Sequence, residues 1–184
     1  MSEAIPAVGA GSFVSPSTGS EGTVGFGSVT HRGSDTGLSS PDPHVRASSA
    51  ASLGLTATSE SDGGEALARL LPLATDDPSP LVRCAALGAL ARLDAAGDAV
   101  RDVWYRTLTD SDTRVRRRAT DTAPVVCVGS VPHSHALIAL LKDGEVAEGA
   151  AWALGELGDT AVSAGAVDPL ADVAVHHDDP LVRE

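Results

Sequence analysis

The chain has 184 residues, enough for one domain with a sizeable core. Hydrophobic residues make up 42% of it but aromatic residues only 3%, which favours closely packed helices of Ala, Leu and Val over a large enclosed pocket. The formal net charge is -12, from 25 acidic and 13 basic residues. This balance argues against general nucleic-acid binding, because an acidic surface repels the phosphate backbone.

The cysteines and the N-terminus indicate a cytoplasmic protein. Cys84 and Cys127 form no CxxC motif, and we expect both to be small buried residues in a reducing compartment. The first residues, MSEAIPAVGAGSF, lack a basic segment followed by an apolar core, and the chain has no run of 18 apolar residues. We therefore expect no membrane partner.

Residues 1–40 are dominated by Gly, Ser and Thr. Such a segment buries too little apolar surface to offset its conformational entropy. A glycine-rich phosphate-binding loop would need a strand before it and a helix after it, and the sequence shows neither. We predict a disordered leader.

From residue 41 onward a short motif recurs: PDPHVRA at 41–47, PSPLVRC at 78–84, SDTRVRR at 111–117, the degenerate DGEVAEG at 143–149, and DDPLVRE at 178–184. The shared valines are 37, 33, 31 and 36 residues apart: Val45, Val82, Val115, Val146 and Val182. This period is typical of stacked helix pairs. The sequence predicts an all-α solenoid over residues 41–184, with about four units and the start of a fifth.

The periodicity inside a unit predicts two helices. Offsets of 0, 4, 8 and 11 from a repeat valine are apolar and share one helical face, as in Val82, Ala86, Leu90 and Leu93. A second apolar stripe precedes each valine segment, as in Leu67, Leu70, Leu71 and Ala74, and in Val100, Val103, Trp104 and Leu108. Each unit therefore reads as a first helix, an acidic turn and a second helix.

The turns predict helix caps and a ladder of ion pairs. The residues three before a repeat valine include Asp42, Asp112 and Asp179, which can accept from free backbone N–H groups. Prolines at the first helical position lose no hydrogen bond there: Pro43, Pro80 and Pro180. The residue after the valine is arginine in four units: Arg46, Arg83, Arg116 and Arg183. Three of these follow an aspartate by four residues, and we expect such pairs to form a structural ladder along the stack.

The segments DDPLVRE, LVRCAALGALARLDAAGD and AEGAAWALGELGD resemble the HEAT-like repeats of phycobilin lyases, over residues 41–184. The resemblance implies an α-solenoid but is poorly specific for function, because such repeats occur in phycobilin lyases, deoxyhypusine hydroxylases, relatives of DNA alkylpurine glycosylases and scaffolds.

The catalytic functions of that family find little support in the residues. Deoxyhypusine hydroxylases hold two irons with His-Glu dipeptides, and none of the six histidines here precedes a glutamate. His133 with His135, and His176 with His177, can also be solvated turn residues. A lyase would need aromatic residues on a concave face, and the candidates are Trp104, Tyr105 and Trp152. Two of the three lie on the core stripe or beside it, and we expect large aromatic residues in these alanine-rich repeats to fill the core. No catalytic residue, cofactor or metal is predicted.

One unit departs from its siblings. Six of the 13 basic residues fall within residues 101–118: Arg101, Arg106, Arg114, Arg116, Arg117 and Arg118. They can form a solvated face neutralised by nearby aspartates, or a binding site for an acidic partner or anion. Pro124 should kink or end the second helix of this unit near Ala123.

We therefore predict a non-catalytic protein-interaction scaffold, its concave face formed by the second helices. A lyase-like or metal-dependent enzyme and an anion- or nucleic-acid-binding protein are the alternatives. The motif at 178–184 starts a fifth unit, which predicts a fragment of a longer protein or self-association through an uncapped C-terminal end.

Overall fold

The computed structural model describes residues 37–57, 60–94 and 96–183. Residues 1–36 of the expected leader lie outside the described residues. The helices, in chain order, are α2 (Pro43–Thr56), α3 (Glu60–Asp76), α4 (Pro80–Asp94), α5 (Asp98–Thr107), α6 (Thr113–Val126), α7 (Val131–Leu140), α8 (Ala147–Leu157), α9 (Asp159–Ser163), α10 (Val167–His176) and α11 (Pro180–Arg183). The described residues contain no strand, and the predicted all-α solenoid is confirmed.

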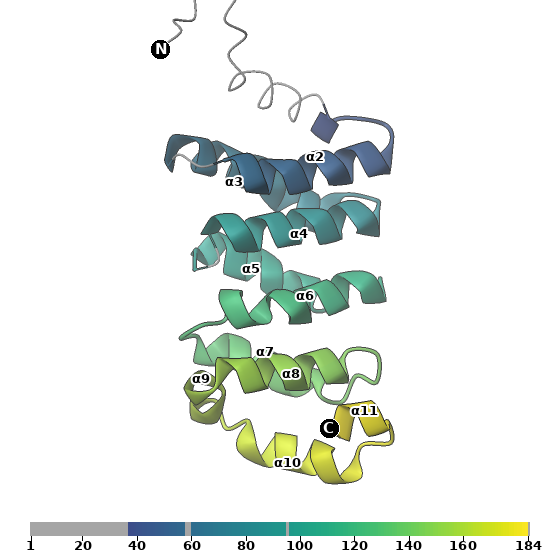
Figure 1. Cartoon of the computed structure of the whole chain (residues 1–184), viewed down its shortest axis with the longest axis vertical. Helices are drawn as coiled ribbons and strands as arrows, with labels where there is room; N and C mark the ends of the chain where they lie inside the picture. Colours follow the sequence, from purple (N-terminus) through teal and green to yellow (C-terminus); the bar gives the residue numbers. More distant parts are fainter. Residues whose placement is uncertain (1–36, 58–59, 95, 184) are drawn as a thin grey trace, which may run out of the picture.

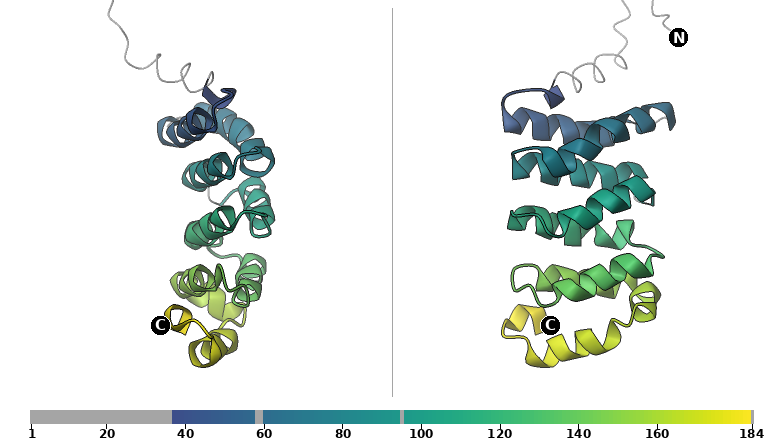
Figure 2. Two further views of the ribbon diagram at one scale, coloured as in Figure 1. Left: turned by 90° about the vertical axis from the view of Figure 1, so that its right-hand side faces the viewer. Right: turned by 180° about the vertical axis from the view of Figure 1, so that it is seen from behind.

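The helices form two layers along one axis (Figures 1 and 2). The second helices α2, α4, α6 and α8 lie side by side in one layer, and each packs against the next. The first helices α3, α5 and α7 form the other layer. No described helix is both long and apolar enough to cross a membrane.

The starts of α2, α4, α6 and α11 follow from their turn chemistry, whereas α8 has neither a proline at its start nor a side-chain cap. Helices α2, α4 and α11 begin at the predicted prolines Pro43, Pro80 and Pro180, where the missing N–H has no helical partner to lose. The Asp42 side chain accepts from the backbone N–H of His44 at 2.8 Å, and Asp112 does the same for Arg114 at 2.9 Å. The predicted caps are confirmed at these two aspartates.

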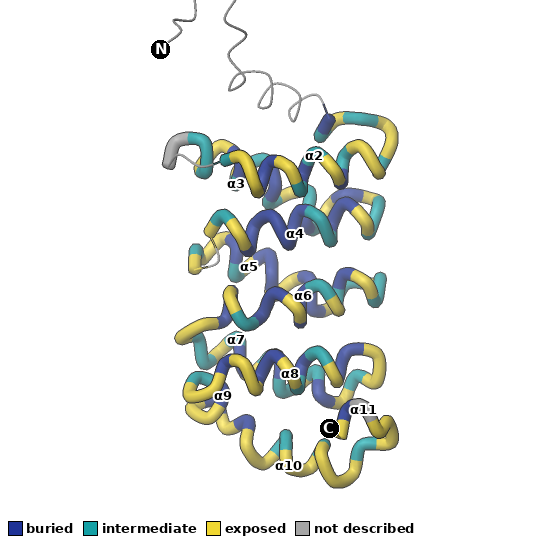
Figure 3. The backbone as a smooth tube through the Cα atoms, viewed as in Figure 1, coloured by how far each residue is buried: buried dark blue, intermediate teal, exposed yellow. Residues whose placement is uncertain are grey.

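The apolar stripes form a core between the layers. Val82, Ala86 and Leu90 are fully buried, and the matching residues at the start of α8 and within it are also buried: Val146, Ala150 and Leu154. Figure 3 shows this buried band within the stacked helices. Val45 differs from the other repeat valines because it is 43% exposed. Within the described residues no helix pair precedes α2, and only the short segment at Gly37 lies near this side of it.

Glycines let neighbouring second helices approach closely. A Cβ on Gly54 of α2 would lie 2.5 Å from the Cβ of Ala89 and 2.7 Å from its Cα, and a Cβ on Gly149 of α8 would lie 2.5 Å from the Oγ1 of Thr120. Both contacts leave no room for a side chain, so these glycines set the distance between adjacent units.

Two regions differ from the periodic prediction. Helix α6 continues through Pro124 to Val126, so of the two predicted outcomes, a kink or an end near Ala123, the end is wrong. The extra short helix α9 follows α8, and Gly158 joins them with a φ of +49°, which favours glycine. Helix α10 then contributes no fully buried residue, so the last described pair is less regular than the others.

Candidate binding surface on the second helices

An arginine on each of three second helices binds an acidic residue of the following turn. Arg46 donates from Nε and Nη2 to the two carboxylate oxygens of Asp77, at 2.8 and 2.9 Å. Arg83 makes the same bidentate contact with Asp110, at 2.8 and 2.7 Å. All four side chains are nearly buried, with exposed fractions of 13% or less. Bidentate geometry and burial make these pairs stronger than ordinary surface ion pairs.

The third arginine of this series, Arg116, does not form a bidentate pair with a single carboxylate. Arg116 Nε lies 3.5 Å from Asp143, and its Nη2 donates to Glu145 at 2.5 Å. Glu145 also accepts from Thr113 Oγ1. The hydrogen bond from Thr113, the largest effect, lowers the pKa of Glu145; desolvation opposes this shift, and the positive charge of Arg116 adds to it.

Each of these three arginines, and Arg183 of α11 as well, also donates a hydrogen bond within its own turn. Nη1 donates to the carbonyl six residues earlier: Ser40 for Arg46, Asp77 for Arg83, Asp110 for Arg116 and His177 for Arg183. Asp77 and Asp110 in turn accept from backbone N–H groups two residues later. One arginine therefore ties together two consecutive turns.

This pairing differs from the predicted one. Asp42 and Asp112 cap helices and do not pair with Arg46 and Arg116 four residues later, since those arginines reach the next unit. Arg183 donates to the carbonyls of its own turn. The sequence does carry the correct signal, because Asp77, Asp110 and Asp143 recur every 33 residues. For Arg46 and Arg116, the prediction used the wrong aspartate of the turn.

The structure divides the six predicted arginines of residues 101–118. Arg101, on α5, donates to the carbonyls of Val126 and Val128 at the end of α6, at 3.0 and 3.1 Å. Arg106, also on α5, is exposed and lies 3.8 Å from Asp76. Arg116 belongs to the turn contacts. These three arginines therefore do not form one surface with the rest.

The other three arginines of this set, all on α6, line one hollow. Arg114, Arg117 and Arg118 line a hollow of about 440 Å³ between α4 and α6, which also contains Leu81, Cys84, Ala85 and Asp121. Arg114 binds Asp112 at 2.8 Å, and Arg117 Nε donates to the Glu145 carbonyl at 3.2 Å. The Arg118 side chain has no hydrogen-bond or ion-pair partner among the described residues and lies over Gly88 of α4. Burial, the largest effect, raises the pKa of the Cys84 thiol, and Arg118 opposes that shift.

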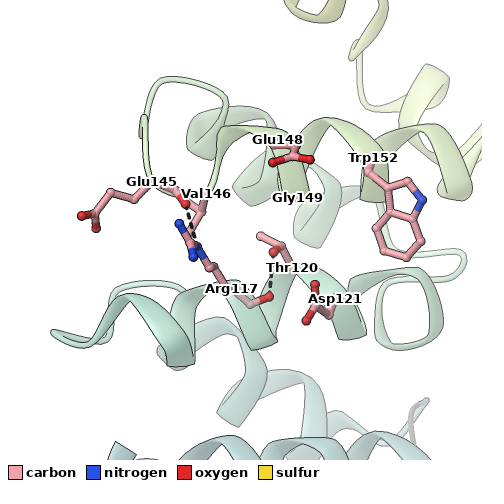
Figure 4. A pocket seen from close by; sticks show the side chains of 8 residues that line it. All are labelled: Arg117, Thr120, Asp121, Glu145, Val146, Glu148, Gly149 and Trp152. Carbon is pink, nitrogen blue, oxygen red and sulfur yellow. Dashed lines mark hydrogen bonds between the residues drawn. The ribbon is translucent and has the colours of Figure 1, made fainter. Parts of the chain in front are cut away.

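A second hollow, of about 410 Å³, lies between α6 and α8. Its lining includes Arg117, Asp121, Glu148 and Trp152. Figure 4 shows the indole of Trp152 extending from α8 toward α6 on the side of Asp121, with Arg117 at the opposite end and turned toward Glu145. A third hollow, between α8 and the segment of α10 and α11, shares Glu148 and Trp152. We call this row the second-helix surface: the hollow between α4 and α6, the one between α6 and α8, and the one beyond α8.

The prediction that large aromatic residues fill the core is correct for Trp104 and wrong for Tyr105 and Trp152. Trp104 is fully buried, and its Nε1 donates to the Ala119 carbonyl at 2.8 Å. Trp152 is 52% exposed and Tyr105 55% exposed. Trp152 lies six residues after Val146, about 240° around a helix, on the side opposite the buried stripe. The helical period alone therefore contained this signal.

The turn position predicted for the histidines is wrong for His133 and His135, which lie within α7, whereas His176 and His177 lie at the end of α10. His133 Nδ1 lies 2.5 Å from Ser130 Oγ, and the ring packs edge-on against Trp104. Burial, together with the charge of Arg101, lowers the pKa of His133. His176 Nδ1 lies 3.0 Å from Asp172, and His177 accepts from the Asp179 N–H. In the part of the chain that the structure describes, no three His, Cys, Asp or Glu side chains are placed to hold a metal ion.

Comparison with known proteins supports the repeat architecture. Residues 36–123 match the family model of HEAT repeats. Crystal structures of two engineered proteins each have a TM-score of 0.58 and 22% identity to this chain; the alignments cover 82% and 84% of this chain and 73% and 76% of theirs. A third engineered protein has a TM-score of 0.54 and 22% identity, over 83% of this chain and 45% of its own. At 22% identity, the likeness to these structures shows the fold alone. A separate comparison with curated proteins found no match.

Proposed function

We propose that this chain is a HEAT-repeat protein-interaction module that binds an acidic segment of a partner protein through its second-helix surface. The observation that carries the proposal is the hollow between α4 and α6, where Arg114, Arg117 and Arg118 lie beside apolar side chains. Arg118 has no ion-pair partner among the described residues, so its guanidinium is available to a carboxylate.

Two further features support a polypeptide ligand. Leu81 is 41% exposed at this hollow and can receive an apolar side chain. The surface continues over α8, where Trp152 is exposed. Stacked helix pairs present such extended surfaces by their geometry, and aromatic and arginine residues are enriched where proteins bind one another. Residues 147–159, AEGAAWALGELGD, further suggest that these units are of the phycobilin-lyase repeat type.

The test is a binding titration with fluorescent peptides of alternating Glu and Leu, measured by anisotropy. We expect binding that weakens when glutamine replaces glutamate, because the guanidinium groups then face a neutral ligand. Exchanging Arg117 and Arg118 together for Glu should weaken binding at least tenfold, as reversed charges repel the ligand. Arg116 stays unchanged because it holds two turns together.

The matched control reverses two arginines of the first-helix layer, Arg69→Glu with Arg106→Glu. It makes the same change in net charge but leaves the hollow between α4 and α6 intact. Helical circular dichroism should be unchanged in both double variants. Equal weakening by both would show that only net charge matters, and equal affinity for the glutamine peptides would refute the proposal.

A further inference from the structure

We infer that the hollow between α6 and α8 is a binding site for a cationic side chain, specifically an arginine guanidinium of the same partner segment. The inference rests on the proposed function for its ligand, but it concerns a different hollow and the opposite charge. Arg117 and Asp121 lie between the two hollows and line both, whereas of these two hollows Glu148 and Trp152 line only the one between α6 and α8. It assigns to Trp152, Asp121 and Glu148 the recognition of a basic group next to the acidic group held between α4 and α6.

The shape of the site suits a flat cation. The indole of Trp152 is half exposed and extends into the hollow toward α6 (Figure 4). A guanidinium stacks on an indole face through both its charge and its planarity. A hollow of about 410 Å³ holds such a group with part of its aliphatic stem.

The charges around the indole favour a cation over an anion. Asp121 and Glu148 line the hollow, and neither carboxylate has an ion-pair or hydrogen-bond partner within the described residues. Arg117, the basic residue of this lining, sits at the far end and donates to the Glu145 carbonyl. Two unpaired carboxylates therefore face the half of the hollow that contains Trp152.

The two neighbouring hollows fix the spacing of the ligand groups. Packed helices have axes about 8–10 Å apart, so the site between α4 and α6 and the site between α6 and α8 are separated by roughly that distance. A polyproline II peptide rises about 3.1 Å per residue with three residues per turn. Side chains three residues apart then lie on one side, about 9 Å apart. A glutamate followed three residues later by an arginine matches both hollows.

The probe is a short peptide in which two prolines separate a glutamate from an arginine, with a partner peptide in which citrulline replaces the arginine. Citrulline has nearly the same shape and no charge. Binding is followed by the NMR signals of the two indole N–H groups, since Trp104 is buried and serves as the internal reference. We expect the arginine peptide to shift the Trp152 signal and to bind about tenfold more tightly than the citrulline peptide, from one cation–π contact and two carboxylates.

Variants separate this site from its neighbours. Trp152→Leu and Glu148→Gln should each weaken binding of the arginine peptide, the latter about threefold, and leave citrulline binding unchanged. Glu156→Gln is the matched control, because Glu156 is an exposed carboxylate of α8 outside the hollow. Equal affinity for both peptides, or an equal effect of Glu148→Gln and Glu156→Gln, would overturn the inference.

A single-group ligand distinguishes failure of this inference from failure of the proposed function. N-acetylarginine amide carries no acidic group, so it should shift the Trp152 signal whether or not acidic peptides bind between α4 and α6. The same ligand with citrulline should leave that signal in place. If acidic peptides bind and N-acetylarginine amide gives no shift, the cation site is refuted while the proposed function stands.

Discussion

The two sides of α6 carry arginines that are neighbours in sequence and differ in every contact. Arg116 faces the turns, is 16% exposed, and binds Asp143, Glu145 and the Asp110 carbonyl. Arg118, two residues later, faces away from the turns over Gly88 and has no ion-pair partner among the described residues. In a stacked repeat, the register of an arginine relative to the next unit decides whether it holds the structure or can bind a ligand. A count of basic residues within 101–118 does not distinguish the two.

The largest expected effect tests the turn side. Arg83→Met should destabilise the protein by about 3 kcal/mol, because it leaves the nearly buried Asp110 carboxylate without its bidentate partner. Arg118→Met should change stability by less than about 0.5 kcal/mol, as for surface positions in general. Urea unfolding followed by circular dichroism measures both.

A double variant serves as the control for this comparison. Arg83→Met combined with Asp110→Leu removes both charges, so it should recover much of the lost stability. Equal destabilisation by Arg83→Met and Arg118→Met would show that the two sides of the layer are energetically alike and would contradict the comparison.

The second prediction contrasts two glycines of the second-helix layer. Gly54→Ala should destabilise by about 2 kcal/mol, because its new Cβ meets both Cβ and Cα of Ala89 at 2.7 Å or less. Gly88→Ala should stabilise by up to about 1 kcal/mol, since its Cβ meets the end of the Arg118 side chain, which can move, and alanine favours the helix. Thermal unfolding of both variants tests this. Destabilisation by Gly88→Ala would mean that Arg118 is held in place rigidly.

The third prediction concerns acid. Burial alone would raise the pKa of Asp77, but hydrogen bonds from Arg46 and from the Ser79 N–H, with the charges of Arg46 and Arg83, lower it overall. A depressed pKa in the folded state adds stability above the ordinary value near 3.8 and loses it as the pH falls through that value toward the folded-state pKa. The melting temperatures of the wild type and Asp77→Asn should therefore converge between pH 5 and about pH 2. If the difference in melting temperature between the wild type and Asp77→Asn stays constant over this pH range, the Asp77 charge does not stabilise the fold.

The sequence predicted the fold more completely than the surface. Helix starts at Pro43 and Pro80 and the buried stripe of Val82, Ala86 and Leu90 follow from local rules of φ, capping and helical period. The arginine partners did not follow, because Arg46 reaches Asp77 across a whole unit and its sequence neighbour Asp42 is used as a cap. Trp152 was misplaced because residue type was weighed above its position on the helix. Helix α9 has no periodic counterpart from which it could be predicted.

The smallest expected effect on the protein is alkylation of Cys84, which tests the proposed ligand-binding side of α6 without a mutation. Cys84 is half-buried at the hollow between α4 and α6, whereas Cys127 is fully buried and its pKa is raised to about 12 by desolvation. Because the thiolate is the reactive form, iodoacetamide at pH 8 should modify Cys84 slowly and Cys127 only after unfolding, as measured by intact mass and peptide mapping. An acidic peptide seated over Arg117 and Arg118 should cover Cys84 and slow its modification, whereas the glutamine version should not. If saturating acidic peptide leaves the rate of Cys84 modification the same as without peptide, the ligand binds elsewhere. The two sides of α6 would then still differ in structural contacts, but the proposed binding role of the side with Arg117 and Arg118 would be refuted.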